Sequence, residues 1–97
     1  MAVSTKTSRF MDRGYRPIDV HSVTVTKSNK KGAAACFGGT LVEHKDGEFH
    51  IDLRTVINGK PVTCIVRAGD IVFTTGMSTR WQVLSKKNFN KRFTVIK

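Results

Sequence analysis

Apolar and polar residues alternate along much of the chain after Pro17, with the two-residue period of a half-buried β-strand. The clearest example is residues 48–57, in which Phe49, Ile51 and Leu53 share one face and polar residues share the other. Shorter runs of similar composition predict further strands over residues 18–27, 33–43, 60–67, 71–75, 80–84 and 93–96. This pattern is typical of an all-β domain.

Two of these runs depart from simple alternation. In the first run the apolar set changes parity between Val20 and Val23, which predicts a β-bulge near Ser22. In the second run Gly38 and Gly39 interrupt a series of small residues. This pair predicts a sharp bend or a second bulge, as small barrels use at their corners.

Turn signals separate the expected strands. Asp46-Gly47 and Asn58-Gly59 predict hairpins, because these residue types adopt the positive φ that tight two-residue turns need. Further turns are expected at residues 28–32, 68–70 and 76–79. About five to seven short strands joined in this way predict a small β-barrel, either SH3-like or OB-like.

The sequence SKKNFNKRF near the C-terminus breaks the alternation. Ser85 is a good N-cap, and Phe89 and Phe93 are four residues apart, so one helical turn places both rings on one face. A helix this short is unstable alone in water, so the two rings have to hold it against the strands. Lys87 and Lys91 would then share its outer face.

Residues 1–16 show neither helical nor strand periodicity, and they carry more basic than acidic residues. Phe10 and Tyr15 are isolated apolar points in this segment. We expect a flexible basic arm over residues 1–16, docked through one of these rings, and a single small barrel domain over residues 17–97.

Charge is the strongest feature of the composition. The chain has 97 residues, with 17 Lys and Arg against 7 Asp and Glu, and a formal net charge of +10. Such an excess on one small domain produces a positive potential over much of its surface, so an anionic partner is expected. DNA, RNA or an acidic protein surface would fit, and a basic protein that merely gains solubility is the plainer alternative.

We expect a cytoplasmic protein. No run approaches the ~18 apolar residues of a membrane span, so no membrane partner is expected. The N-terminal residues lack the apolar run of a signal peptide. Cys36 and Cys64 fall in strand-like runs, where a reduced cysteine behaves as a small hydrophobe, and one disulfide between them is the alternative.

Acidic and basic residues are unevenly distributed along the chain. Four of the seven acids, Glu43, Asp46, Glu48 and Asp52, lie in one expected hairpin. A protein that binds phosphates needs a cationic face with its acids elsewhere. The candidate nucleic-acid-binding residues are therefore Arg80, Lys86, Lys87, Lys91, Arg92, Lys30, Lys31, Arg9, Arg13 and Arg16.

The single tryptophan, Trp81, lies among these basic residues. It is in phase with Val83, whereas Arg80 and Gln82 point the other way. We therefore expect Trp81 on the core face and Arg80 in solvent. The alternative is an exposed ring on which a base stacks.

Catalytic and metal sites have little support. Glu48, His50 and Asp52 share one strand face and offer oxygen and nitrogen ligands, but no Cys-x-x-Cys or His-x-x-x-His spacing accompanies them. Cys36 beside a histidine would lack a third orienting group. The chain contains no nucleotide-binding or hydrolase motif. We expect no enzymatic activity, no metal and no cofactor.

Residues 66–96 contain an ordered series of short motifs. An apolar residue is followed by a Gly-Asp-aliphatic run, then by Gly, then by an aromatic-x-Val motif and finally by two spaced phenylalanines. This order resembles the C-terminal part of short phage-encoded accessory proteins. The matching positions are Gly69, Asp70, Ile71, Val72, Gly76, Trp81, Val83, Phe89 and Phe93. Ala68 stands where proline is usual, and Ile71 where an aromatic residue is usual. The resemblance implies a fold, a viral origin and a turn capped by Asp70, and it brings no catalytic residue. A viral origin would in turn imply the host cytoplasm as the location of the protein.

These features predict a non-enzymatic module that binds nucleic acid mainly through phosphate contacts. The alternative is a phage-encoded inhibitor or regulator that binds an acidic face of a host protein. A third hypothesis is a structural subunit that pairs through an exposed edge strand. The sequence does not distinguish DNA from RNA and does not indicate an oligomeric state.

Overall fold

Most of the alternating runs form β-strands in the structure, a computed structural model that describes residues 5–76 and 80–96. Within these residues the chain is mostly β, with two sheets and two short helices. The elements are β1 (Lys6–Asp12), β2 (Arg16–Thr24), α1 (Lys30–Phe37), β3 (Thr40–Glu43), β4 (Phe49–Ile57), β5 (Lys60–Val66), β6 (Ile71–Thr75), β7 (Gln82–Leu84), α2 (Lys86–Arg92) and β8 (Phe93–Val95). The turn expected at residues 76–79 lies largely outside the described residues.

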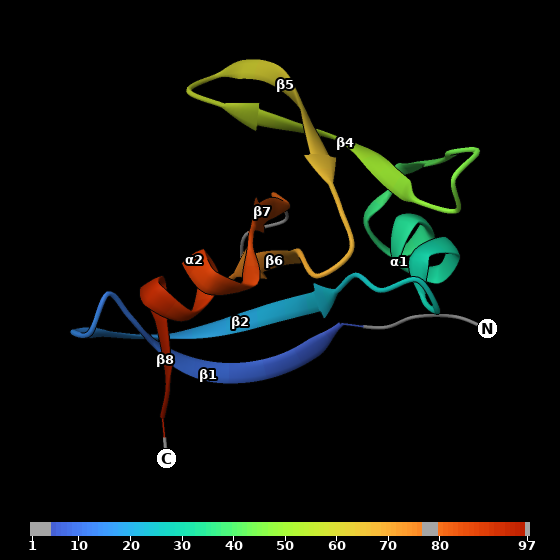
Figure 1. The fold of residues 1–97 in the computed structure, drawn as a ribbon. Coiled ribbons are helices and arrows are strands. Elements are labelled where there is room, and N and C mark those ends of the chain that lie inside the picture. The colour runs from blue at the N-terminus through green and yellow to red at the C-terminus, as the bar shows by residue number, and fades with distance from the viewer. Residues whose placement is uncertain (1–4, 77–79, 97) are drawn as a thin grey trace.

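The two sheets are antiparallel and lie one above the other in Figure 1. One has the strand order β7-β6-β2-β1-β8 and the other the order β3-β4-β5. Asn58 and Gly59 both adopt positive φ, at 52° and 77°, which confirms the tight hairpin between β4 and β5. No closed barrel is found among the described residues, so the SH3-like or OB-like architecture stays a prediction.

The flexible arm expected over residues 1–16 is wrong for residues 6–16. β1 lies inside the larger sheet, where it pairs with β2 on one side and with β8 on the other. Phe10 packs on the rings of Phe89 and Phe93. Polar residues on both faces of β1 hide the strand period, and its backbone ladders supply the stability that the sequence pattern does not reveal.

The strand expected over residues 33–43 is confirmed for residues 40–43, which form β3, and is wrong for residues 33–37, because residues 30–37 form helix α1. Ala33 and Ala34 are buried, and alanine has the highest helix propensity of all residues. Gly38 ends the helix in the left-handed conformation at φ 70°. A Cβ on Gly39 would lie 2.5 Å from a methyl group of Ile51, so the Gly pair is a helix end packed closely on β4.

The parity change in β2 has a different cause from the bulge expected near Ser22. The register of β2 with β6 is uninterrupted from Val20 to Thr24, and its register with β1 is uninterrupted up to Ser22. Val20 packs on one face of the sheet with Phe73, whereas Val23 packs on the opposite face with Val72. The sheet therefore carries a hydrophobic core on each face, and β2 contributes to both.

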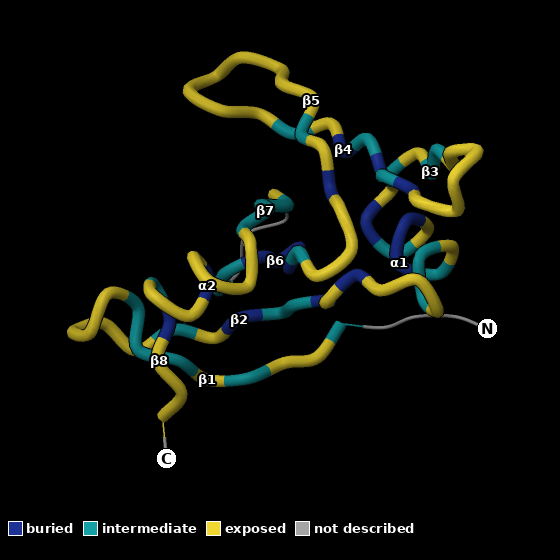
Figure 2. Tube along the Cα trace, viewed as in Figure 1, coloured by how far each residue is buried: buried dark blue, intermediate teal, exposed yellow. Residues whose placement is uncertain are grey.

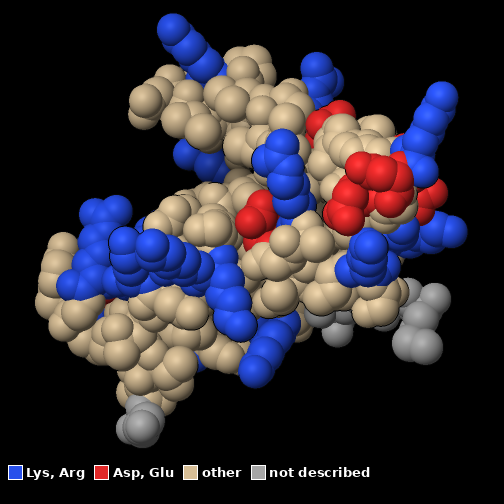
Figure 3. Space-filling view, viewed as in Figure 1, with Lys and Arg blue, Asp and Glu red and all other residues tan. Residues whose placement is uncertain are grey.

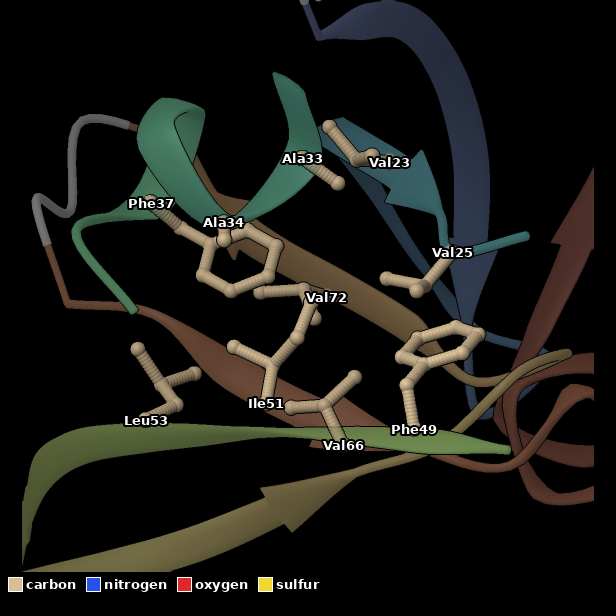
Figure 4. Packing of buried hydrophobic residues seen from close by; sticks show 10 residues of the cluster. All are labelled: Val23, Val25, Ala33, Ala34, Phe37, Phe49, Ile51, Leu53, Val66 and Val72. Carbon is tan, nitrogen blue, oxygen red and sulfur yellow. The ribbon is translucent and has the colours of Figure 1, made fainter. Parts of the chain in front are cut away.

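The first core, called here the inter-sheet core, lies between the larger sheet, α1 and the smaller sheet (Figure 4). Its buried residues are Val23, Val25, Ala33, Ala34, Phe37, Phe49, Ile51, Leu53, Val66 and Val72. The expected face of Phe49, Ile51 and Leu53 is confirmed, since all three are buried. Figure 2 shows that this burial fades toward the far end of the β4–β5 hairpin.

The second core, called here the aromatic core, lies between α2 and the other face of the larger sheet. The centre of the Phe89 ring lies 5.5 Å from the ring centre of Phe10, 5.4 Å from that of Phe73 and 4.8 Å from that of Phe93. The Ser85 hydroxyl accepts a hydrogen bond from the Asn88 backbone N–H at 3.3 Å. The helix expected at residues 85–93 is confirmed, with both rings holding it against the sheet.

Candidate nucleic-acid interface

Three exposed lysines, Lys86, Lys87 and Lys91, lie on α2 and are called here the α2 patch. The helix is fixed beneath them by Phe89, which is only 4% exposed, so the lysines are presented from an anchored element. Among residues 5–76 and 80–96, none of the three forms an ion pair with a carboxylate. Figure 3 shows Lys and Arg side chains gathered over this helix.

The turn between β1 and β2 adds two arginines beside the patch. The Arg13 backbone N–H donates to the Arg92 carbonyl at 2.7 Å, so this turn meets the C-terminal end of α2. Arg16 is exposed and lies opposite Asp12 in the hairpin register. The Arg13 side chain is 67% exposed, and its contact with the Asp12 carboxylate is long, at 4.0 Å. Both arginines thus extend the cationic surface of the α2 patch.

Arg92 has a structural part in this surface. Its Nε and Nη2 donate to the two carboxylate oxygens of Asp12, at 3.1 and 3.4 Å, and its Nη1 donates to Gln82 at 3.4 Å. The guanidinium also lies 4.7 Å from the centre of the Phe93 ring. Three donors of Arg92 are already hydrogen-bonded and its charge is neutralised by Asp12. Arg92 therefore links α2 to β1 and contributes little to binding a phosphate.

The remaining expected cations lie elsewhere. Lys30 and Lys31 begin α1, and Lys30 Nζ contacts a carboxylate oxygen of Glu43 at 2.7 Å. The hydrogen bond and the charge of Lys30 lower the pKa of Glu43 below its ordinary value, and burial opposes this shift only weakly. Figure 3 shows the acidic side chains gathered at this end of the molecule. The charge of Lys30 is thus compensated locally.

Arg9 is also separated from the α2 patch. Its neighbour Phe10 points into the aromatic core beneath α2, so Arg9 points to the opposite face of the sheet. There its guanidinium lies 3.6 Å from the Asp19 carboxylate, with both side chains more than half exposed. The structure therefore brings together Lys86, Lys87, Lys91, Arg13 and Arg16 and leaves Lys30, Lys31 and Arg9 outside this surface.

Trp81 and Arg80 lie at a cleft that the sequence did not indicate. Trp81 and Val83 both pack on the inter-sheet core, which confirms their shared face, and Arg80 is exposed. The centre of the Trp81 ring lies 6.0 Å from the centre of the Phe37 ring. The Trp81 side chain is nevertheless only partly buried. A cleft of about 440 Å³ opens beside it. The cleft is lined by Thr55, Val56, Ile57, Asn58, Cys64, Arg80, Trp81, Gln82 and Val83.

The smaller sheet carries a row of polar contacts at the acidic end. His44 Nε2 lies 2.7 Å from His50 Nδ1, and His50 Nε2 lies 3.4 Å from an Asp52 carboxylate oxygen. Glu48 points to Lys27 instead, at 3.9 Å. In the part of the chain that the structure describes, no group of three or more His, Cys, Asp and Glu side chains is arranged to hold a metal ion.

The cysteines and the turn aspartate have plain structural roles. Cys36 and Cys64 are both unpaired and partly buried, and Cys36 lies on α1 where a strand was expected. His21, one of the histidines that could act as a base for Cys36, is instead hydrogen-bonded to Thr7 at 2.8 Å. Asp70 accepts a hydrogen bond from the Arg67 backbone N–H at 3.0 Å, as expected for a residue that caps a turn.

Comparison of the chain with protein-family models, with curated proteins and with solved structures finds no match. Neither helix in the described residues is long and apolar enough to cross a membrane. α1 has eight residues and α2 has seven.

Proposed function

We propose that this chain is a non-enzymatic module that binds nucleic acid, mainly through phosphate contacts at the α2 patch and the neighbouring β1–β2 turn. The observation that carries the proposal is the uneven compensation of charge. Lys86, Lys87 and Lys91 have no carboxylate partner among the described residues, whereas Lys30 and Arg9 do. Cations without internal partners keep their full potential for an external anion.

The anchoring of α2 supports this proposal. A phosphate ligand gains more from cations on an ordered element than from the same charges on a mobile segment, because less side-chain and backbone freedom is lost on binding. The Phe89 ring and the Arg92–Asp12 pair hold the helix in place. An SH3-like or OB-like barrel would add a curved sheet face, but this finer architecture is a prediction that the proposal does not need.

A salt titration tests the proposed function. The full chain is titrated into a fluorescent duplex and a fluorescent single strand at several salt concentrations, with anisotropy as the measurement. Phosphate binding predicts that log K falls linearly with log salt, by about 0.9 per phosphate neutralised on duplex DNA and about 0.7 on a single strand. If neither the duplex nor the single strand binds at low salt, the proposal is contradicted.

The alternative from the sequence, a phage-encoded regulator that binds an acidic face of a host protein, would use the same cations. A pull-down from nuclease-treated and untreated lysate separates the two functions. A nucleic-acid-binding module loses its captured material after nuclease treatment. A protein-binding regulator retains one captured protein under both conditions, and in that case the alternative replaces the proposal.

A further inference from the structure

The cleft beside Trp81 is lined by apolar side chains and by polar ones. One wall comes from the far half of the β4–β5 hairpin, and the other comes from β7 and the two residues before it. The Thr55 hydroxyl donates a hydrogen bond to the Trp81 carbonyl at 2.8 Å, which joins the two walls. The cleft has a volume of about 440 Å³, which is within the usual range for sites that bind small molecules.

Several apolar side chains at this cleft remain in contact with water. Val56 is 39% exposed and Ile57 is 50% exposed, although a domain this small has few apolar side chains to spare from its core. Both lie where the hairpin extends beyond the body of the molecule (Figures 1 and 2). Exposed apolar residues gathered at a concave site indicate a ligand with apolar surface.

Positive charge lies directly beside the exposed apolar residues of this cleft. Arg80 lines it, and β7 runs from the cleft through Ser85 into the first lysines of α2. Figure 3 shows the cationic side chains over α2 on the same face of the molecule as the β4–β5 hairpin. A matching ligand therefore combines planar apolar groups with closely spaced negative charges.

An unpaired nucleic-acid strand has this combination, and a duplex does not. In a duplex the bases are stacked against one another, whereas the bases of a single strand turn outward and stack on aromatic side chains. We infer that the cleft receives bases of a single-stranded nucleic acid, which stack on Trp81 while the neighbouring phosphates contact Arg80 and the α2 patch. This inference rests on the proposed function and names its ligand class.

The test uses Trp81 as its own reporter, since it is the single tryptophan of the chain. The full chain is titrated with a twelve-nucleotide oligo(dT) and with a mixed-sequence duplex of the same length at low salt. Stacking predicts quenching of Trp81 emission by the single strand and affinity about tenfold higher than for the duplex. The duplex leaves the emission nearly unchanged.

Two substitutions in the cleft sharpen the test. Ile57→Ser removes an apolar wall group that is half exposed, so the fold should tolerate it, and single-strand affinity falls several-fold with duplex affinity unchanged. Trp81→Leu lowers single-strand affinity about tenfold, whereas Trp81→Phe retains most of it, because only phenylalanine keeps a stacking ring. Val95→Ser is the matched control, since Val95 is 61% exposed on β8 and does not line the cleft.

The outcomes separate this inference from the proposed function. Equal affinity for the two ligands with unchanged Trp81 emission overturns the single-strand inference and leaves phosphate binding intact. Absence of binding to both ligands overturns the proposed function itself. Quenching by polyglutamate without any effect of oligo(dT) assigns the cleft to an acidic protein segment and overturns the single-strand inference.

Discussion

The two helices begin with the same two residues and differ in their surroundings. Each is short and begins with two lysines, Lys30-Lys31 in α1 and Lys86-Lys87 in α2. α1 lies at the acidic end of the molecule, where Lys30 pairs with Glu43. α2 lies at the opposite end of the larger sheet, where its lysines have no such partner among the described residues (Figure 3). The number of lysines therefore does not distinguish the two helices, whereas the pairing of those lysines with carboxylates does, and the proposed binding surface rests on this difference.

The two helices are also anchored in different ways. α1 buries the small side chains of Ala33 and Ala34 together with Phe37 in the inter-sheet core. α2 buries the single ring of Phe89, and the next residue after the helix, Phe93, packs beside it. A helix held by so few side chains depends strongly on each of them. This difference gives α2 the larger response to substitution.

The largest expected effect is at this anchor. Phe89→Ala removes a ring that contacts three others, and we expect the free energy of unfolding to fall by about 3–4 kcal/mol. Urea denaturation followed by circular dichroism measures the change. Phe89→Leu is the control and retains most of the stability. A loss below about 1 kcal/mol for Phe89→Ala would contradict the aromatic core as described.

A smaller loss is expected at the ion pair that ties α2 to β1. Asp12→Asn leaves the partly buried Arg92 guanidinium without its counter-charge, which costs about 2 kcal/mol. Asp19→Asn removes the partner of Arg9 in a pair that is more than half exposed, and it costs less than about 0.5 kcal/mol. Equal losses for the two variants, measured by urea denaturation, would mean that burial does not distinguish these pairs.

The functional difference between the helices is tested by matched pairs of substitutions. Lys87→Gln with Lys91→Gln should lower nucleic-acid affinity about tenfold and reduce the slope of log K against log salt by about one to two. All sequences should weaken alike, because phosphate contacts position a ligand without specifying it. Lys30→Gln with Lys31→Gln removes the same charge and leaves the slope nearly unchanged. If the two double variants lower the affinity and the salt slope equally, the nucleic-acid interface is not confined to the α2 patch.

The smallest effect is a pH dependence at α1. Because Lys30 lowers the pKa of Glu43 in the folded state, the carboxylate stabilises the fold above its ordinary pKa of 4.5. This contribution is lost as pH falls through the lowered folded value. The stability difference between the natural chain and Glu43→Gln should therefore be flat from pH 7 to pH 5 and shrink below pH 4.5. A difference that grows on acidification would reverse the assigned sign.

Local signals explain which elements were predictable. The helix α2 is predictable from Ser85, Phe89 and Phe93, because an N-cap and a four-residue spacing are both local signals within about two turns of helix. The small residues of α1 fit a strand as well as a helix, so the pattern alone predicts the wrong element there, although an Ala run followed by Gly-Gly is also typical of a helix with its C-terminal cap. β1 was missed because two neighbouring strands stabilise it, and its own sequence carries no apolar period.

The candidate site was predictable only in part, for the same reason. The outward placement of Lys87 and Lys91 follows from their spacing on α2. The pairing of Arg92 with Asp12 joins residues 80 positions apart, and no sequence period reports such a contact. The cleft at Trp81 likewise depends on how a distant hairpin lies beside β7.

The change of parity within β2 restricts how this strand can misalign. In a strand with one buried face, a shift by two residues keeps the alternation and is a plausible error. In β2 a shift by two would place polar Ser22 at the position of Val20 and carry Val23 away from the cover of α1. A shift by one would move each set to the opposite face, away from its packing partners. Only one alignment of β2 fills both cores, so the register of this strand is strongly specified.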